Sequence, residues 1–217
     1  MSSRAAAADA AGAGTTAKRR AILAGALSVF ARDGYARASI DAIAEAADVS
    51  TRTIYNHFGD KAGLFGAVVQ DSAAAVASAH VEQIDAILGA IQSAADVEDA
   101  LVSCALALHA IVPPDAPHWG LLRHVHADAE HIPADVIEAW RRLGPARTKR
   151  QLALHFSDLT RRGLLQLEDP ETAAVHYSAL TGSAWHSALE PDPAPQRALQ
   201  LVGAAISTFL HGYLPRG

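Results

Sequence analysis

The sequence predicts an all-α protein of about nine helices, and three observations lead to this class. Alanine, the residue with the highest helix propensity, is very frequent along the 217-residue chain. Aromatic residues make up only 6% of the sequence, and no stretch shows the alternation of apolar and polar residues that is typical of a half-buried strand. Apolar residues instead recur at steps of three and four, which is the spacing of an amphipathic helix.

The first predicted helix covers about residues 16–33 and ends at Gly34. Its apolar residues fall on one stripe: Ile22, Leu23, Ala26, Leu27, Val29 and Phe30. We expect residues 1–15 to form a disordered arm, because they are small and offer little apolar surface to bury. Lys18, Arg19 and Arg20 then lie in the first helical turn, where the helix dipole disfavours cations. Either a phosphate partner or a solvated basic turn would account for them.

Two short helices and a long one are predicted next. Ser39 and Ser50 are suitable N-caps for the second and third helices, which are joined by a turn at Asp48. Gly59 ends the third helix, and Lys61 stands at the start of a fourth that reaches about residue 91. Prolines separate the later helices, which we place at about residues 96–111, 117–130, 133–162, 170–189 and 194–212. The pair Gly144-Pro145 predicts a kink or break within one of these helices.

Charge is distributed unevenly between the two ends of the chain. The net charge is −5, but residues 1–70 hold eight Lys/Arg against six Asp/Glu, a net of +2. Residues 71–217 hold ten Lys/Arg against seventeen Asp/Glu, a net of −7. A basic end can contact phosphates while an acidic body stays in solution, so this distribution is compatible with a nucleic-acid partner.

Several functional classes are disfavoured by what the sequence lacks. No GxSxG, P-loop, CxxC, HExxH or Rossmann glycine pattern occurs, so we predict neither an enzyme nor a cofactor. Cys104 is alone and cannot form an intramolecular disulfide. We find no uncharged apolar run long enough to span a bilayer and no secretory signal, and we therefore expect a cytoplasmic protein with no membrane partner.

The third predicted helix has the composition of a helix that enters the major groove of DNA. Val49, Ile54 and Phe58 can pack inward, which leaves a set of donors and short polar groups facing outward: Thr51, Arg52, Thr53, Tyr55, Asn56 and His57. No acidic residue lies on this helix, and acids would be repelled by phosphate. Two short helices joined by a tight turn predict a helix-turn-helix.

Residues 18–66 resemble the DNA-binding domain of TetR-type regulators. The segments FARDGY (residues 30–35), SIDAIAEAADVS (residues 39–50) and TIYNHFGDK (residues 53–61) carry the resemblance. Asp48 departs from the glycine that is usual in the turn, but Asp tolerates the left-handed conformation. The resemblance implies a DNA-binding domain over residues 16–62, with Arg52 and Thr53 reading bases. It also implies phosphate or base contacts from Thr51, Tyr55 and His57, and phosphate clamps at Ser39 and Lys61.

Residues 63–217 are expected to form a helical regulatory and dimerisation domain. Within it, the segments DAEHIP (residues 128–133), GLL (residues 163–165) and DPETAA (residues 169–174) carry a resemblance of residues 121–215 to the AefR-like C-terminal domains. This resemblance implies that the last two long helices pair with their copies in a homodimer. The predicted interface residues are Ala173, Leu180, Ala184, Val202, Ile206 and Phe209. The same apolar stripes would also suit a core within one chain, and this alternative stays open.

The resemblance further implies a pocket for a small hydrophobic or aromatic ligand that releases the protein from DNA. Candidate lining residues are large or have polar tips within apolar stretches: Cys104, His109, Trp119, His124, Trp140, Phe156, Tyr177 and Trp185. Each of them would also fit ordinary core packing.

The predicted function is therefore a transcriptional repressor that binds a palindromic operator. The alternatives are control by a protein partner, or by a metal bound at the histidine cluster His118, His124, His126 and His131. The spacing of these histidines disfavours a shared metal, because His124 and His126 point in different directions on a helix.

Overall fold

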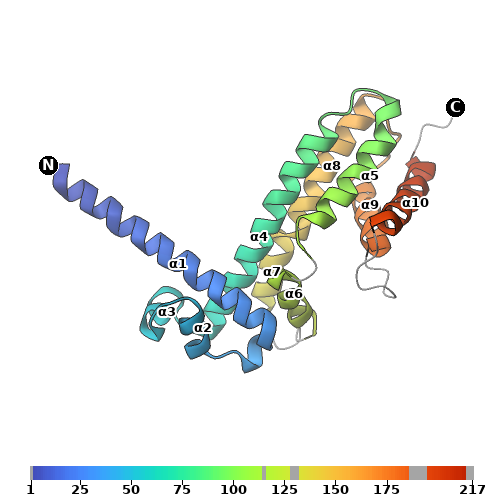
Figure 1. The fold of residues 1–217 in the computed structure, drawn as a ribbon. Helices are drawn as coiled ribbons and strands as arrows, with labels where there is room; N and C mark the ends of the chain where they lie inside the picture. The colour runs from blue at the N-terminus through green and yellow to red at the C-terminus, as the bar shows by residue number, and fades with distance from the viewer. Residues whose placement is uncertain (1, 114–115, 128–131, 186–194, 214–217) are drawn as a thin grey trace. The chain divides into compact units, whose positions relative to one another are not determined.

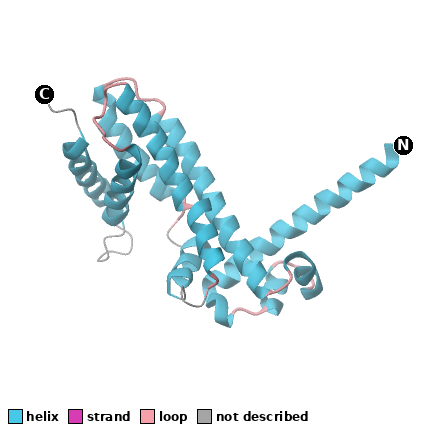
Figure 2. Ribbon diagram, turned by 180° about the vertical axis from the view of Figure 1, so that it is seen from behind, coloured by secondary structure: helices cyan, strands magenta, loops and turns pink. Residues whose placement is uncertain are grey.

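A computed structural model describes residues 2–113, 116–127, 132–185 and 195–213, and within these the side chains of residues 2–14, 126, 183–185, 195 and 212–213 are not described. Helices joined by loops make up this part of the chain, and it contains no strand (Figure 2). The predicted all-α class is confirmed.

The first helix, α1 (Ser2–Arg37), begins earlier than the sequence predicts (Figure 1). The prediction of a disordered arm over residues 1–15 differs from the structure, in which residues 2–15 are helical. Seven of the first fourteen residues are alanine, whose high helix propensity favours a helix even where there is little apolar surface to bury. As a consequence Lys18, Arg19 and Arg20 lie in the middle of α1 and not in its first turn. Gly34 departs from helical geometry with φ 74°, so the predicted stop appears as a kink before one last turn.

The next helices follow the predicted capping pattern. They are α2 (Ile40–Ala46), α3 (Thr51–Phe58) and α4 (Lys61–Leu88). Asp60 caps α4, because its carboxylate accepts a hydrogen bond from the backbone N–H of Gly63 at 2.7 Å.

The remaining helices are α5 (Val97–Ala110), preceded by the 3-10 turn η1 (Ala94–Asp96), then α6 (Pro117–Ala127), α7 (Ala134–Leu143), α8 (Pro145–Arg161), α9 (Pro170–Trp185) and α10 (Pro195–Tyr213). The predicted helix over residues 133–162 is broken at Gly144, and Pro145 becomes the first residue of α8. Proline suits that position because its missing N–H would have no helical partner there.

The chain divides into two compact units, which differ from the two domains expected on either side of residue 62. The first unit comprises residues 1–73 and 115–140, and the second comprises residues 74–114 and 141–217. Residue 62 falls inside α4 and marks only the end of the family resemblance. Helix α6 belongs to the first unit because it packs on α1, where Gly120 approaches the backbone of Ala31 so closely that a Cβ would lie 2.8 Å from the carbonyl oxygen.

The core of the first unit joins α1 to the two short helices. Ile22, Phe30, Ile43 and Ile54 are fully buried in one cluster, together with Leu121 of α6. Phe30 meets Phe65 of α4 edge to face, with ring centroids 5.0 Å apart. These contacts fix the orientation of α3, whose buried residue is Ile54.

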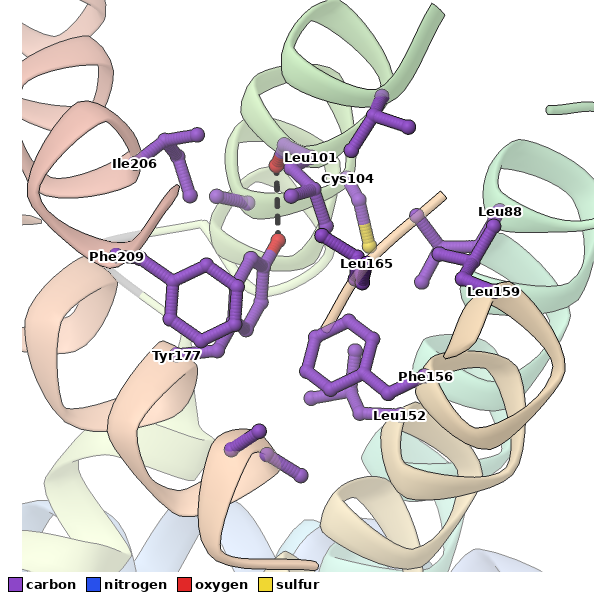
Figure 3. Packing of buried hydrophobic residues seen from close by; sticks show 14 of the residues in the cluster. Leu88, Leu101, Cys104, Leu152, Phe156, Leu159, Leu165, Tyr177, Ile206 and Phe209 are labelled. Atoms are coloured by element: carbon purple, nitrogen blue, oxygen red, sulfur yellow. Dashed lines mark hydrogen bonds between the residues drawn. The ribbon is translucent and has the colours of Figure 1, made fainter. Parts of the chain in front are cut away.

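The core of the second unit is built around three aromatic rings (Figure 3). The ring centroids of Phe156, Tyr177 and Phe209 lie 5.6–5.8 Å from one another. They bring α8, α9 and α10 together, and Leu101 and Cys104 of α5 lie in the same cluster. Burial of these apolar side chains stabilises the unit.

Helix α4 is long and apolar enough to cross a membrane by length and composition. Its apolar residues, however, supply both cores: Leu64, Phe65 and Val68 pack in the first unit, and Ile84 and Leu88 pack in the second. Core packing therefore explains the apolar character of this helix.

Candidate nucleic-acid interface

Helices α2 and α3 form the predicted helix-turn-helix. The hydroxyl oxygen of Ser39 accepts a hydrogen bond from the N–H of Ala42 at 3.1 Å, and that of Ser50 accepts one from the N–H of Thr53 at 3.2 Å. Asp48 lies in the left-handed region with φ 51°, as the turn requires. Both caps and the turn residue thus take the roles that the sequence predicts for them.

The inner side of α3 is apolar and holds the helix on its unit. Ile54 is fully buried, while Val49 and Phe58 are half-buried against the same core. A helix of only eight residues has little stability of its own, so this packing keeps it folded and sets which side chains face outward.

The outer side of α3 presents donors without any acid. Arg52 and Asn56 are exposed, and Tyr55 is 49% exposed, an unusual degree for a large aromatic side chain. Thr51, Thr53 and His57 are half-buried beside them. Such side chains can hydrogen-bond to phosphate oxygens and to base edges in the major groove. Asn56 is a further candidate contact for which the resemblance supplied no role.

Three predicted DNA contacts already have partners within the protein. The hydroxyl oxygens of Thr53 and Ser50 lie 2.9 Å apart, and Ser39 caps α2, although a hydroxyl that accepts one bond can still donate another. The Nζ atom of Lys61 donates to the carbonyl of Ala36 at 3.2 Å and lies 4.9 Å from the ring centre of Tyr35. Lys61 therefore also ties the end of α1 to the start of α4.

A second group of cations lies on the same unit, in α1. Lys18, Arg19 and Arg20 are all exposed, and the guanidinium of Arg19 lies 5.4 Å from the ring centre of Phe58, the last residue of α3. These cations stand out in the sequence, but nothing in the sequence indicates that Arg19 would lie against α3.

The residues predicted to line a ligand pocket divide between the two units. Trp119, His124 and Trp140 belong to the first unit, where Trp140 packs on the core and the His124 ring lies against Gly34. Cys104, His109, Phe156 and Tyr177 belong to the second unit. The Trp185 side chain lies outside the described residues. No single cluster within one unit therefore unites the predicted set.

Three of the second-unit candidates, Cys104, Phe156 and Tyr177, lie in one buried cluster (Figure 3). The hydroxyl of Tyr177 donates to the carbonyl of Leu101 at 2.9 Å, and Cys104 lies beside it. Burial raises the pKa of the Cys104 thiol to about 11 and also raises the pKa of Tyr177. Both groups therefore stay neutral at physiological pH, so this part of the apolar core contains two uncharged polar groups.

The predicted dimer-interface residues require a correction. Ala173, Val202 and Ile206 are fully buried and Phe209 is 2% exposed, all within the core of one chain. Leu180 is half-buried, and the Ala184 side chain lies outside the described residues. The alternative left open for these stripes, an intramolecular core, is the one that the structure supports for those four side chains. The periodicity identified an apolar stripe but could not tell which neighbour would cover it.

Metal ligation finds no candidate among the described side chains. No group of three or more His, Cys, Asp or Glu residues is arranged there to hold an ion. His126 and His131 of the sequence cluster lie outside the described side chains. Ser72 Oγ lies 2.7 Å from Nδ1 of His118, so that histidine has a hydrogen-bond partner on α4.

Two family models match this chain. Residues 22–68 match the model for bacterial regulatory proteins of the tetR family. Residues 99–215 match the model for the C-terminal domain of AefR-like transcriptional repressors, which covers more than half of the chain.

Individual relatives agree with these models. The HTH-type transcriptional repressor AcnR of Corynebacterium glutamicum is 43% identical over 68 residues, which are 31% of this chain and 36% of that protein. The chain thus matches about a third of that relative. Among solved structures, a putative TetR-family transcriptional regulator from Mesorhizobium loti has a TM-score of 0.78 and 27% identity, covering 93% of this chain and 98% of that one. The flavonoid-responsive regulator FrrA has a TM-score of 0.67 and 25% identity, covering 92% and 98%.

Proposed function

Because the chain belongs to the TetR family of bacterial transcription regulators, we propose that it represses transcription by binding a palindromic operator as a homodimer. The observation that carries this proposal is the acid-free outer side of α3, with Arg52, Tyr55 and Asn56 exposed on a helix whose other side is buried. Packing on the core already orders this helix, so it would not have to fold on binding. Its hydrogen-bond donors match the acceptors on phosphates and base edges. A regulator of this kind works in the cytoplasm.

We place the recognition roles as the resemblance implies. Arg52 and Thr53 read base edges near the start of α3, and Thr51, Tyr55 and His57 contact phosphate or bases. Ser39 and Lys61 hold phosphates at the starts of α2 and α4, where backbone N–H groups and the helix dipole favour an anion. For Lys61 this requires its ammonium to share or leave the Ala36 carbonyl.

The homodimer would use the outer faces of α9 and α10. Val175 is 48% exposed and Leu199 is 51% exposed, and Gly203 lies one turn after Leu199. No Asp, Glu, Lys or Arg occurs over residues 172–185 or 198–213, although 19% of the whole chain is charged. Solvent-exposed helix faces without charge are typical of surfaces that a partner covers. Two-fold symmetry would then present two recognition helices to successive major grooves, ~34 Å apart.

Gly203→Arg tests this interface without disturbing the chain itself. A Cβ at Gly203 would meet nothing within 4 Å in the single chain, and arginine favours a helix more than glycine does. We expect the variant to fold, to behave as a monomer by sedimentation, and to lose high-affinity operator binding. Ser157→Arg, at an exposed position of α8, is the matched control and should remain dimeric. A dimeric Gly203→Arg protein would move the interface elsewhere.

The second unit would hold the effector. Its core combines three aromatic rings with the neutral hydroxyl of Tyr177 and thiol of Cys104, which suits a small hydrophobic or aromatic ligand. FrrA is described as flavonoid-responsive, and that chemistry is of the same class. The ligand would favour a conformation with lower affinity for DNA and so release the operator.

Selection of bound sequences from random DNA, followed by footprinting, tests the proposed function. The expected result is a palindromic sequence protected at nanomolar protein, with binding released by an aromatic compound in a ligand screen. Recovery of no preferred sequence would contradict the DNA-binding proposal. If only a metal, or only another protein, released the chain from the operator, the proposed repressor function would stand and the proposed organic effector would be wrong.

A further inference from the structure

We propose that the basic turn of α1, formed by Lys18, Arg19 and Arg20, is a second DNA-contacting element that binds phosphates beside the recognition helix. This inference rests on the proposed DNA binding and extends the interface beyond α2, α3 and the start of α4. It assigns a role to these three cations, which the sequence predicts at a helix N-terminus. In the structure they lie in the middle of α1.

The direction of Arg19 follows from the buried stripe of α1. Ile22 and Leu23 are buried in the first unit's core, three and four residues after Arg19. Residues at those spacings lie on one face of a helix, so Arg19 continues the stripe at the point where α1 leaves the core. On this face Arg19, Thr15 and Thr16 are exposed, so the side of α1 that is apolar over the core becomes polar beyond it.

The contact with Phe58 fixes where this polar surface lies. The guanidinium of Arg19 stands 5.4 Å from the ring centre of Phe58, at the end of α3. A cation over an aromatic face is attracted to it, which orders the arginine side chain while its N–H groups remain able to donate. Arg19 is therefore adjacent to the helix that would enter the major groove, where the phosphates that flank the groove also run, and Lys18 and Arg20 flank it on the same exposed turn.

The charges of this turn are not neutralised by the protein's own acids. Lys18, Arg19 and Arg20 are exposed, and among the described side chains none of them forms an ion pair. Positions three and four residues away on either side hold no Asp or Glu, so the helix offers no intrahelical partner. Elsewhere in the structure exposed arginines do find acids, as Arg32 does with Asp33 and Arg162 with Asp158.

Three adjacent like charges repel one another, and the neighbouring sequence does nothing to relieve that repulsion. A polyanion relieves it directly, because each phosphate contact neutralises one cation and releases condensed counterions. A merely solvated turn would leave the salt dependence of DNA binding unchanged when the charges are removed. The two readings therefore differ in a measurable quantity.

The experiment compares two triple variants of the full-length protein that lose the same charge. Lys18→Ala, Arg19→Ala and Arg20→Ala remove the basic turn, and alanine preserves the helix. The control removes three exposed cations of α7 and α8, Arg141→Ala, Arg142→Ala and Arg150→Ala. Circular dichroism and thermal melting first establish that both variants are folded.

The readout is the slope of log affinity against log salt concentration, measured on the selected operator and on random DNA. We expect the α1 variant to lower the magnitude of this slope by about 2–3 on both DNAs, at about 0.9 per phosphate contact, and to leave base preference intact. We expect the control slope to match the wild type. A variant that fails to fold is replaced by Arg19→Gln alone, for which the expected slope change is about 0.9.

Equal slopes for the α1 variant and the wild type would overturn the inference, as would an equal change in the control. Neither result touches the proposed function, since the wild-type protein would still select an operator. Failure of the proposed function would appear separately, as a wild-type chain that binds no DNA with sequence preference.

Discussion

Tyr55 and Tyr177 show how differently the two units use the same chemistry. Tyr55 lies on α3 in the first unit and is 49% exposed, and the proposed function assigns it a contact with DNA. Tyr177 lies on α9 in the second unit with 1% exposed, and its hydroxyl donates to the Leu101 carbonyl. In the first unit the candidate functional side chains, those of α3, face outward, whereas in the second unit candidates such as Tyr177 and Cys104 are part of the core. Surface chemistry can therefore be interpreted from the sequence of the first unit, but not from that of the second.

The largest effect that we expect is a difference in the free energy of unfolding between alanine variants of these two tyrosines. Tyr177→Ala removes a fully buried ring from the aromatic cluster and should lower the free energy of unfolding by about 3–5 kcal/mol, measured by urea denaturation. Tyr55→Ala removes an exposed ring and should change that free energy by no more than about 0.5 kcal/mol. The same Tyr55 variant should bind the operator more weakly, which gel-shift titration measures.

A Tyr177→Ala protein as stable as the wild type would mean that the cluster is loosely packed and open to a ligand. A large stability loss for Tyr55→Ala would show that this side chain belongs to the core of its unit. Either result would remove the contrast between the units.

The features that the sequence predicted correctly are those that depend on near neighbours in the chain. The caps Ser39 and Ser50, the turn at Asp48 and the break at Gly144 each involve residues within four positions of one another. Because their hydrogen bonds are local, composition and spacing suffice to place them.

The features that differed depend on contacts between distant segments. Periodicity found the stripes of α9 and α10 but could not show that Val202 and Phe209 are covered by their own chain, whereas Val175 and Leu199 are exposed. Likewise, α6 lies in the first unit because it packs on α1, a contact between segments about ninety residues apart. The position of Arg19 over Phe58 is of the same kind.

A smaller expected effect is a pH dependence of stability that His80 gives to the second unit. His80 lies within the second unit, where its Nε2 is 3.2 Å from the Leu108 carbonyl and its Nδ1 is 3.3 Å from Thr148 Oγ1. Burial lowers the pKa of His80 below its ordinary value of 6.5, although the Leu108 carbonyl acts in the opposite direction. Below pH 6.5 the unfolded chain takes up a proton that the folded chain resists, so stability is full above this pH and falls as the pH drops.

We therefore expect His80→Gln to reduce the loss of stability between pH 7 and pH 5.5, as measured by thermal melting across that range. His176→Gln, which removes an exposed histidine of α9, is the control and should leave the loss unchanged. A profile for His80→Gln that matches the wild type would show that this half-buried histidine does not govern the acid response of the second unit.

The central claim is that the outer side of α3 reads base sequence, and Arg52→Ala tests it most directly. Its affinity for the selected operator and for random DNA should be measured at one salt concentration, beside Lys61→Ala. We predict that Arg52→Ala loses about 1–3 kcal/mol on the operator and relaxes the preference at one base pair, with a much smaller loss on random DNA. Lys61→Ala should weaken both DNAs alike. Equal losses on operator and random DNA for Arg52→Ala would contradict the account.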